Sequence, residues 1–389
     1  MKTEIVKTGL IFLLAFLTGV NFVVFPALGT AFTDPSVFAL SSSQFGSLFL
    51  PQVVCIIISC LSAPFLVNRF GPKVILAAGI ALMILSTGVL WSLQFFMQDK
   101  SLLFPVLMVL VAFTGSGFGL SITTLNPLAA SLFKDNPSSA ILILQFLVGL
   151  GTSASPLMMS IAGDVHHWMY VPGIIVIAVG CSFIAFLFIS LPKEKFFELP
   201  AQLRIPPKLW LFFGLIVLYG FIEGTFGSFG TIILKGRGLS NSEASLGLSL
   251  FWGGIAVNRL LFGIFARKND LSLIYLLSPI GVGAGIVLLL LLLSGSGWML
   301  SLMFLTGFFM GSIFPGTIGW GTVEFPTLTV MVSGFLMAAN QVGTGIVTNV
   351  LGHFASRTSF ILYGLAILSA LICICLFLLK KNSKIKEAF

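Results

Sequence analysis

The chain is a succession of long, continuous apolar stretches separated by short polar ones. About 20 apolar residues suffice for a helix to cross a bilayer, and backbone in lipid must satisfy its own hydrogen bonds. Apolar and polar residues do not alternate here as they would in a strand, so we expect helices. We place twelve transmembrane helices at 8–32, 43–67, 73–95, 102–131, 138–162, 169–191, 208–234, 243–267, 272–294, 297–323, 328–353 and 358–380.

The composition agrees with an all-α membrane protein. Of the 389 residues, 57% are hydrophobic and 8% charged, and the mean hydropathy is +1.11, whereas soluble domains carry roughly 25% charged residues. All five cysteines fall in apolar stretches, where we interpret them as small apolar residues: Cys55, Cys60, Cys181, Cys373 and Cys375. No metal site and no cofactor is expected.

The distribution of lysine and arginine indicates the orientation. Twelve helices put both termini on one side, and the loops of that side carry fifteen of the 20 basic residues, against four on the other side. Because basic loops stay in the cytoplasm, we expect both termini there, in the plasma (inner) membrane of a bacterium. The net charge of +8 is then a property of these loops, and no nucleic-acid partner is expected. The first helix is too long for a secretory signal, so we expect it to be retained.

The sequence repeats itself at an offset of about 200 residues. Ser41 to Gln44 and Ser240 to Glu243 open the second and eighth helices with the same capping-box pattern, in which two residues satisfy free helix amides reciprocally. Three further matches fall in corresponding helices: Thr114, Gly115 and Gly119 with Thr306, Gly307 and Gly311; Gln145 and Gly149 with Gln341 and Gly345; Gly19, Gly29 and Thr30 with Gly220, Gly230 and Thr231.

The longest internal polar stretch lies between the two copies of the repeat. We therefore expect an N-terminal six-helix bundle at 1–191, a cytoplasmic linker at 192–207 and a C-terminal six-helix bundle at 208–389. Two such bundles can rock around a site halfway across the membrane and expose it to one side at a time. The arrangement is typical of secondary transporters.

The loop between the second and third helices supplies a family motif. It reads Pro64-Phe-Leu-Val-Asn68-Arg69-Phe-Gly71-Pro72-Lys73. This resembles the signature loop of the major facilitator superfamily, Gly-x-Leu-x-Asp-Arg-x-Gly-Arg-Lys, with Asn68 in place of the aspartate. The resemblance implies the major facilitator fold and a role for Asn68, Arg69 and Lys73 in latching the two halves on the cytoplasmic side.

Two further stretches look like the fucose–proton symporter branch of that superfamily. They are Phe251 to Gly263, with Asn258-Arg259 inside it, and Gly311-Ser-Ile-Phe-Pro315, followed by Glu324. This resemblance implies that Arg259 and Glu324 act at a cytoplasmic gate. Symporters of the branch use acids in the first and fourth helices, where this chain offers Asn21 and Asn126 instead.

Two charged side chains lie well inside the predicted helices, Glu223 and Arg259. A charge there costs several kcal/mol, by estimates from about 2.5 upward, so each is a candidate functional residue. Glu223 lies roughly 22 Å along its helix, near the midplane. A carboxyl group holds its proton more tightly when it is shielded from water, so a site that alternates between two environments would couple transport to protons.

Other roles of these two residues stay open. Glu223 could bind the solute directly or pair with Arg259. Direct pairing is not favoured, because Arg259 lies about 10 Å nearer the cytoplasm by the helical rise. Arg259 could also bind an anionic solute.

Uncharged polar and aromatic residues at similar depth complete a candidate substrate cavity. Tyr219 and Trp252 could stack on a flat ligand, while amides could bind the solute or simply join helices. The cavity residues are Asn21, Gln52, Gln145, Tyr219, Trp252, Asn340 and Gln341.

The sequence thus predicts a monomeric secondary transporter that moves a small polar solute by alternating access, in symport with protons. The alternative is a drug or metabolite exporter of the same superfamily, working as a proton antiporter. Exporters usually carry Gly-Pro-x-x-Gly-Gly in the fifth helix, whereas this chain has its glycines and Pro156 in another order. An enzyme is not expected, because no cluster of catalytic acids or histidines lies in the helices. No phosphate-binding loop is present either.

Overall fold

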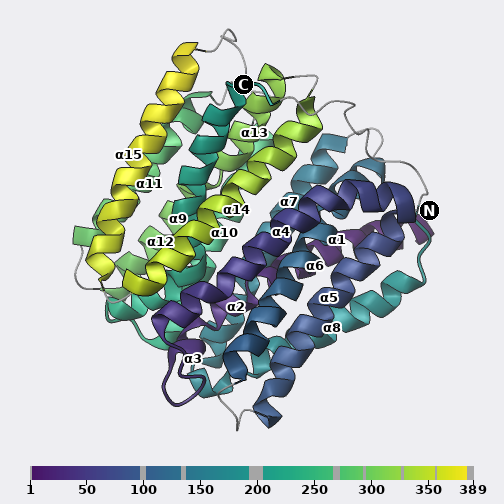
Figure 1. Ribbon diagram of the computed structural model, residues 1–389, viewed down its shortest axis with the longest axis horizontal. Coiled ribbons are helices and arrows are strands. Elements are labelled where there is room, and N and C mark those ends of the chain that lie inside the picture. The colour runs from purple at the N-terminus through teal and green to yellow at the C-terminus, as the bar shows by residue number, and fades with distance from the viewer. Residues whose placement is uncertain are drawn as a thin grey trace. The chain divides into compact units, whose positions relative to one another are not determined.

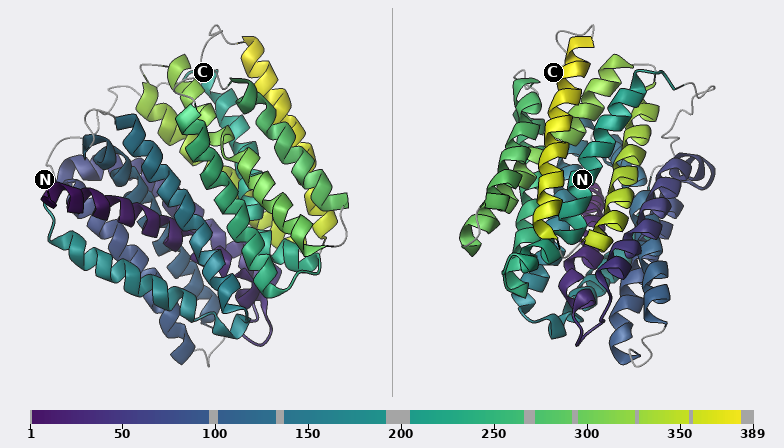
Figure 2. Two further views of the ribbon diagram at one scale, coloured as in Figure 1. Left: turned by 180° about the vertical axis from the view of Figure 1, so that it is seen from behind. Right: turned by 60° about the vertical axis from the view of Figure 1, so that its left-hand side comes forward.

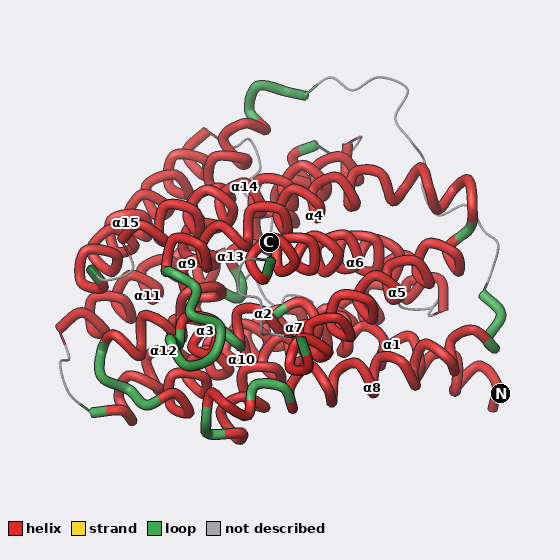
Figure 3. Tube along the Cα trace, turned by 60° about the horizontal axis from the view of Figure 1, so that its bottom comes forward, coloured by secondary structure: helices red, strands yellow, loops and turns green. Residues whose placement is uncertain are grey.

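The structure is a computed structural model that describes residues 2–96, 102–132, 137–191, 205–265, 272–291, 295–325, 328–354 and 357–382. Every regular element in these ranges is a helix (Figure 3). The chain divides into two compact units, Met1–Leu199 and Pro200–Phe389.

The first unit consists of long helices that lie side by side, with shorter pieces between them (Figure 1). Its elements are α1 (Lys2–Phe22), α2 (Val24–Ala27), α3 (Gly29–Thr33), α4 (Ser42–Phe70), α5 (Pro72–Ser92), η1 (Leu93–Phe95), α6 (Leu103–Leu132), α7 (Pro137–Ala162), η2 (Val165–His167) and α8 (Tyr170–Leu187).

The second unit repeats this plan (Figure 2). Its elements are α9 (Leu209–Gly236), α10 (Asn241–Phe265), α11 (Ser272–Leu291), α12 (Ser296–Met310), α13 (Ile313–Glu324), α14 (Thr329–Phe354) and α15 (Thr358–Asn382).

The described helices account for the twelve predicted spans. Ten of them are long and apolar enough to cross a membrane, counting α12 and α13 as one, and α1 contributes a shorter apolar stretch, Val6–Phe22. The remaining span corresponds to α14, which has 26 residues. The predicted all-helical membrane fold is confirmed. The predicted bundle limits stay a prediction, because most of the proposed linker, 192–204, lies outside the described residues.

The first predicted helix, 8–32, is wrong as a single element. It is three pieces, α1, α2 and α3, that meet at Val23 and Leu28. Pro26 has no N–H to give to the carbonyl four residues earlier, which is that of Phe22. The side-chain amide of Gln52 takes over, donating to the Phe22 carbonyl oxygen at 3.4 Å.

The tenth predicted helix, 297–323, is also wrong as a single element. It divides into α12 and α13, with Gly311 and Ser312 between them. Pro315 stands four residues after Gly311, the same spacing as Pro26 after Phe22. A proline is not sufficient to break a helix in this protein, since α4 contains Pro51 and Pro64 without interruption.

The two predicted capping boxes are confirmed. At α4 the Ser41 hydroxyl accepts from the Gln44 N–H at 3.1 Å, and the Gln44 side chain accepts from the Ser41 N–H at 2.9 Å. At α10 the Glu243 carboxylate accepts from the Ser240 N–H at 2.9 Å, and the Ser240 hydroxyl accepts from the Glu243 N–H at 3.3 Å. Equivalent helices of the two units therefore begin in the same way.

Glycines bring equivalent helix pairs into backbone contact in both units. In the first unit α1 crosses α7, and a Cβ on Gly19 would lie closer than 3.0 Å to the carbonyl oxygen of Val148. In the second unit α9 crosses α14, and a Cβ on Gly220 would come equally close to the carbonyl oxygen of Asn340. Gly19 and Gly220 are 201 residues apart, as in the sequence match of these helices. Val148 and Asn340 are 192 residues apart, whereas the sequence match of Gln145 with Gln341 has an offset of 196.

A second pair of crossings follows the same rule. A Cβ on Gly115 of α6 would lie closer than 3.0 Å to the Gln52 carbonyl oxygen of α4, and one on Gly307 of α12 equally close to the Phe251 carbonyl oxygen of α10. In lipid no hydrophobic force drives helices together, so close backbone approach through small residues supplies the packing energy. The sequence repeat is thus a repeat of helix crossings.

This packing predicts which glycines tolerate a methyl group. Gly307→Ala should destabilise the protein by about 1–3 kcal/mol, because overpacking forces α10 and α12 apart. Gly364→Ala is the matched control, since Gly364 is exposed on α15 and a Cβ added there would have no atom within 4 Å. The apparent melting temperature of the detergent-purified variants should fall for Gly307→Ala alone. Equal melting temperatures would contradict the close crossing.

Candidate functional site

Glu223 lies in the interior of the second unit, on α9. The helix has 28 residues, so Glu223 is roughly 22 Å from its start at 1.5 Å per residue. Residues 222 to 231 of α9 are all buried, and Glu223 itself is 8% exposed. Its side chain therefore faces neighbouring helices and not lipid.

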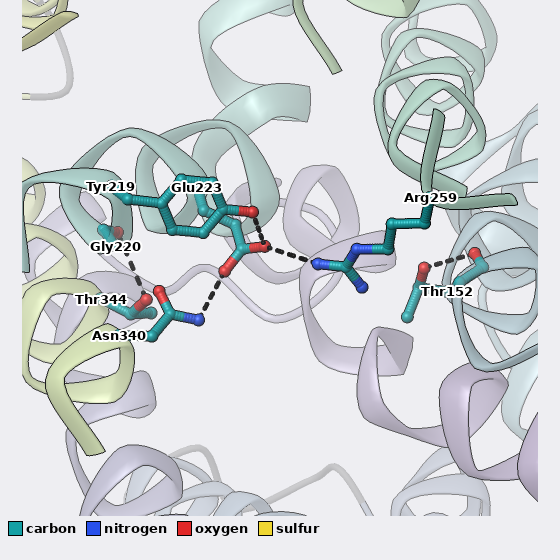
Figure 4. A network of polar contacts seen from close by, with 8 residues as sticks. Thr152, Tyr219, Gly220, Glu223, Arg259, Asn340 and Thr344 are labelled. Atoms are coloured by element: carbon teal, nitrogen blue, oxygen red, sulfur yellow. Dashed lines mark hydrogen bonds and ion pairs between the residues drawn. The ribbon is translucent and has the colours of Figure 1, made fainter. Parts of the chain in front are cut away.

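Three donors from three helices surround the Glu223 carboxylate (Figure 4). The Tyr219 hydroxyl donates to Oε1 at 2.8 Å, and Nδ2 of Asn340 on α14 donates to Oε2 at 2.8 Å. Nη2 of Arg259 on α10 lies 3.7 Å from Oε1. The carboxylate thus accepts two hydrogen bonds and has a cation beside it, and a hydrogen bond to a charged group contributes about 1.5–3 kcal/mol.

Glu223 and Arg259 form a direct ion pair, the alternative that their positions along the helices did not favour. Their positions along α9 and α10 differ by about 10 Å by the helical rise. Side chains of a helix lean toward its N-terminus, however, and α9 and α10 run in opposite directions. Glu223 and Arg259 therefore lean toward each other, and the length of the arginine closes the remaining gap.

Tyr219 is fixed by its ring as well as by its hydroxyl. It lies one turn before Glu223, so both side chains share a face of α9. The phenol is fully buried and stacks on Phe314 of α13, with ring centroids 5.9 Å apart and planes inclined by 22°. Its donor hydroxyl is thereby aimed at the carboxylate.

Two buried donors on α10 lack a partner among the described residues, Trp252 Nε1 and Arg259 Nε. Trp252 is 7% exposed, and its indole lies against Gly227 of α9, where a Cβ would collide with the ring. The two residues are seven apart, about two turns, so they share a face of α10. That face therefore carries Arg259 beside the Glu223 carboxylate and Trp252 against Gly227, one turn further along α9.

The predicted cavity residues of the first unit bond to neighbouring helices. Asn21 is fully buried, and its Nδ2 donates to the Thr87 hydroxyl of α5 at 2.5 Å. Gln52 bonds the carbonyl at the break after α1, as described above. Gln145 of α7 donates to Oδ1 of Asn126 on α6 at 2.9 Å. Each therefore joins two helices in this structure.

One predicted gate residue, Arg259, belongs to the Glu223 cluster, and three of the others contact residues of their own units. Lys73 donates to the carbonyl oxygen of Leu187 at the end of α8, at 2.8 Å, and the Arg69 guanidinium lies 5.1 Å from the ring centre of Phe70. Glu324, at the end of α13, forms an ion pair with Lys208 at the start of α9. Asn68 is near the end of α4. Their role as a latch or gate stays a prediction.

One ion pair of the second unit carried no signal in the sequence. Lys208 and Glu324 are 116 residues apart, and nothing in the local pattern of either residue indicates the pair. Gln341, next to Asn340, is 6% exposed. Within the described residues, no group of three or more His, Cys, Asp or Glu side chains is placed to hold a metal ion.

Comparison with known proteins gives a consistent picture. Residues 8–348 match the sequence profile of the Major Facilitator Superfamily. The glucose/mannose transporter GlcP of Bacillus subtilis (strain 168) is 23% identical over 319 residues, which cover 78% of this chain and 77% of that protein.

Solved structures share the fold. The xylose transporter XylE of E. coli in an inward-open conformation aligns with a TM-score of 0.79 at 13% identity, covering 99% of this chain and 98% of that one. A variant of the nucleoside transporter NupG gives 0.77 at 11% identity, with coverages of 96% and 99%. A variant of the E. coli fucose:proton symporter FucP gives 0.62 at 15%, with coverages of 97% and 99%. The particular resemblance to the fucose symporter branch stays a prediction.

The profile match spans most of the chain, and the helices supply a buried polar site inside an apolar fold. The chain therefore belongs to the Major Facilitator Superfamily, as an integral multi-pass secondary transporter of a small molecule and not an enzyme.

Proposed function

We propose that this protein imports a small hydroxyl-bearing solute of monosaccharide size in symport with protons, and that Glu223 carries the coupling proton. The observation that supports this most directly is the placement of one carboxylate, 8% exposed, in the interior of the second unit, with Arg259 3.7 Å away. A buried carboxylate needs a counter-charge or a proton. Glu223 can have Arg259 as its counter-charge in one state and a bound proton in another.

The coupling follows from that competition. With Arg259 in place, an ionised carboxylate has its counter-charge and the pair carries no net charge. When Arg259 turns away toward a solute, the carboxylate loses its counter-charge, and protonation becomes the cheaper way to keep it buried. Proton binding and solute binding therefore favour each other, which is the requirement for symport.

The chemistry of the solute follows from the groups that face it. Trp252 Nε1 and Arg259 Nε are buried donors without a partner among the described residues, so oxygen acceptors on the solute would satisfy them. An indole also provides an apolar surface for a sugar ring. GlcP carries glucose and mannose in its name, and we extend that class of solute to this chain.

The orientation in the membrane is proposed from the distribution of basic residues. Fifteen basic residues in the loops of one side against four on the other favour cytoplasmic termini. We propose a monomer in the inner membrane of a bacterium, surrounded by lipid.

Removing the ionisable group tests the coupling. In vesicles containing the purified protein, Glu223→Gln should abolish the accumulation of glucose or mannose driven by a pH gradient, because the amide binds no proton. Exchange of labelled for unlabelled sugar without a gradient should persist. Accumulation by Glu223→Gln at the wild-type level would rule out Glu223 as the coupling group.

Glu243→Gln is the matched control for this variant. Glu243 is a half-buried member of the α10 capping box, and Gln44 fills the same role at α4. The control therefore removes a carboxylate of the second unit and keeps its structural function, so gradient-driven uptake should be unchanged.

Removing the indole donor tests the solute class. Trp252→Phe keeps an aromatic ring but loses one hydrogen bond, which should weaken glucose and mannose binding about tenfold. Trp298→Phe is the control, because Trp298 is exposed. Binding measured by titration calorimetry or thermal shift should change for Trp252→Phe alone. Unchanged affinity would remove Trp252 from the solute site.

A further inference from the structure

The crossing of α9 and α14 sets where Asn340 can stand. A Cβ on Gly220 would lie closer than 3.0 Å to both the backbone and side-chain oxygens of Asn340. One on Gly343 would collide with the carbonyl oxygen of Val217. The Thr344 hydroxyl also donates to the Gly220 carbonyl oxygen at 3.3 Å. The two backbones are therefore in contact at this point, and the Asn340 side chain is confined between them and Glu223.

The two ends of the Asn340 amide have different surroundings. Nδ2 donates to Glu223 Oε2 at 2.8 Å. Oδ1 lies over the Cα of Gly220 and has no hydrogen-bond partner among the described residues. The residue is 6% exposed. The amide is thus oriented by Gly220 on one side and by the carboxylate on the other.

The first unit provides a natural comparison. Its α1–α7 crossing has the same close glycines, Gly19 and Gly151. At the equivalent points of the two crossings, however, Val148 stands where the second unit has Asn340. At the offset of 201 residues, Phe22 stands where it has Glu223. The crossing is common to both units, while the amide and the carboxylate occur together in one. The helix crossing therefore does not require the Asn340 amide, which occurs only in the unit that has the Glu223 carboxylate.

We propose that Asn340 is a positioning residue for Glu223 and not a ligand of the solute: held by Gly220, it fixes Oε2 and so sets the pH at which the coupling proton binds. This inference rests on the proposed role of Glu223 in proton coupling. It assigns a different task to a residue that the sequence placed in the solute cavity.

The direction of the effect follows from the chemistry of the amide. Nδ2 can only donate, so it stabilises the ionised carboxylate more than the protonated one. Fixing Oε2 also leaves Oε1 aimed at Tyr219 and Arg259. Without Asn340, the carboxylate would take its proton at a higher pH.

The test measures uptake of radiolabelled glucose and mannose against external pH in vesicles. Asn340→Leu, which keeps the size but not the donor, should raise the pH of half-maximal uptake by about one unit, the equivalent of one lost hydrogen bond. The KM for the sugar should stay within about twofold. A KM raised tenfold or more at an unchanged pH midpoint would make Asn340 a solute ligand and overturn the proposal.

Gly220→Ala tests the same contact from the other helix. It should displace Asn340 and shift the pH midpoint in the same direction, and the double variant should shift no further than either single one. Gly19→Ala is the matched control, because it adds a methyl group to the equivalent crossing of the first unit, where Phe22 stands in place of the acid. Equal pH shifts for Gly19→Ala and Gly220→Ala, or additive shifts in the double variant, would overturn the proposal.

Failure of the proposed function is a separate outcome. Wild-type uptake of both sugars could be absent or independent of pH, or Glu223→Gln could accumulate them normally. Either result would refute the proton-coupling role of Glu223 and, with it, the positioning role of Asn340. If uptake depends on pH through Glu223 while Asn340→Leu keeps the wild-type midpoint, the positioning role falls alone.

Discussion

The free-energy cost of burying a carboxylate in an apolar protein determines which side chains surround Glu223 in the second unit. Estimates for an acid at the centre of a membrane helix begin at about 2.5 kcal/mol, and the penalty disappears only if donors replace water. Glu223 receives those donors from its own helix, from α10 and from α14. Side chains of three helices therefore contact one carboxylate. A change in its proton or its counter-ion alters the contacts of all three helices.

The packing that brings these helices together is independent of the chemistry it serves. The α1–α7 and α9–α14 crossings rely on glycines at matching positions, as do α4–α6 and α10–α12. The side chains at the repeat-equivalent positions differ. Phe22 and Cys60 occupy the places that Glu223 and Arg259 have in the second unit. A repeated scaffold thus allows one unit to carry the charged site while the other retains apolar side chains there.

The sequence was informative where a local rule applies. Hydropathy located the twelve spans, and four residues were enough to identify each capping box, at Ser41 and Ser240. The breaks after Phe22 and before Ser312 were missed, although Pro26 and Pro315 stand four residues beyond the freed carbonyls. Proline alone was an ambiguous signal, because whether a helix breaks depends on what can satisfy the carbonyl. In the first case that is Gln52, on another helix.

Contacts between distant parts of the chain were beyond local rules for a different reason. Depth along a helix axis did not favour a direct pair between Glu223 and Arg259, because the estimate placed side chains at the level of their Cα atoms. Side chains lean toward the N-terminus of their own helix. In two antiparallel helices this lean shortens the gap when each residue lies on the C-terminal side, along its own helix, of the level at which its partner stands. Glu223 on α9 and Arg259 on α10 satisfy this condition. Membrane transporters whose acid and base are separated by about two turns on successive helices can therefore still form a charge pair, and the axial offset alone should not be used to exclude one.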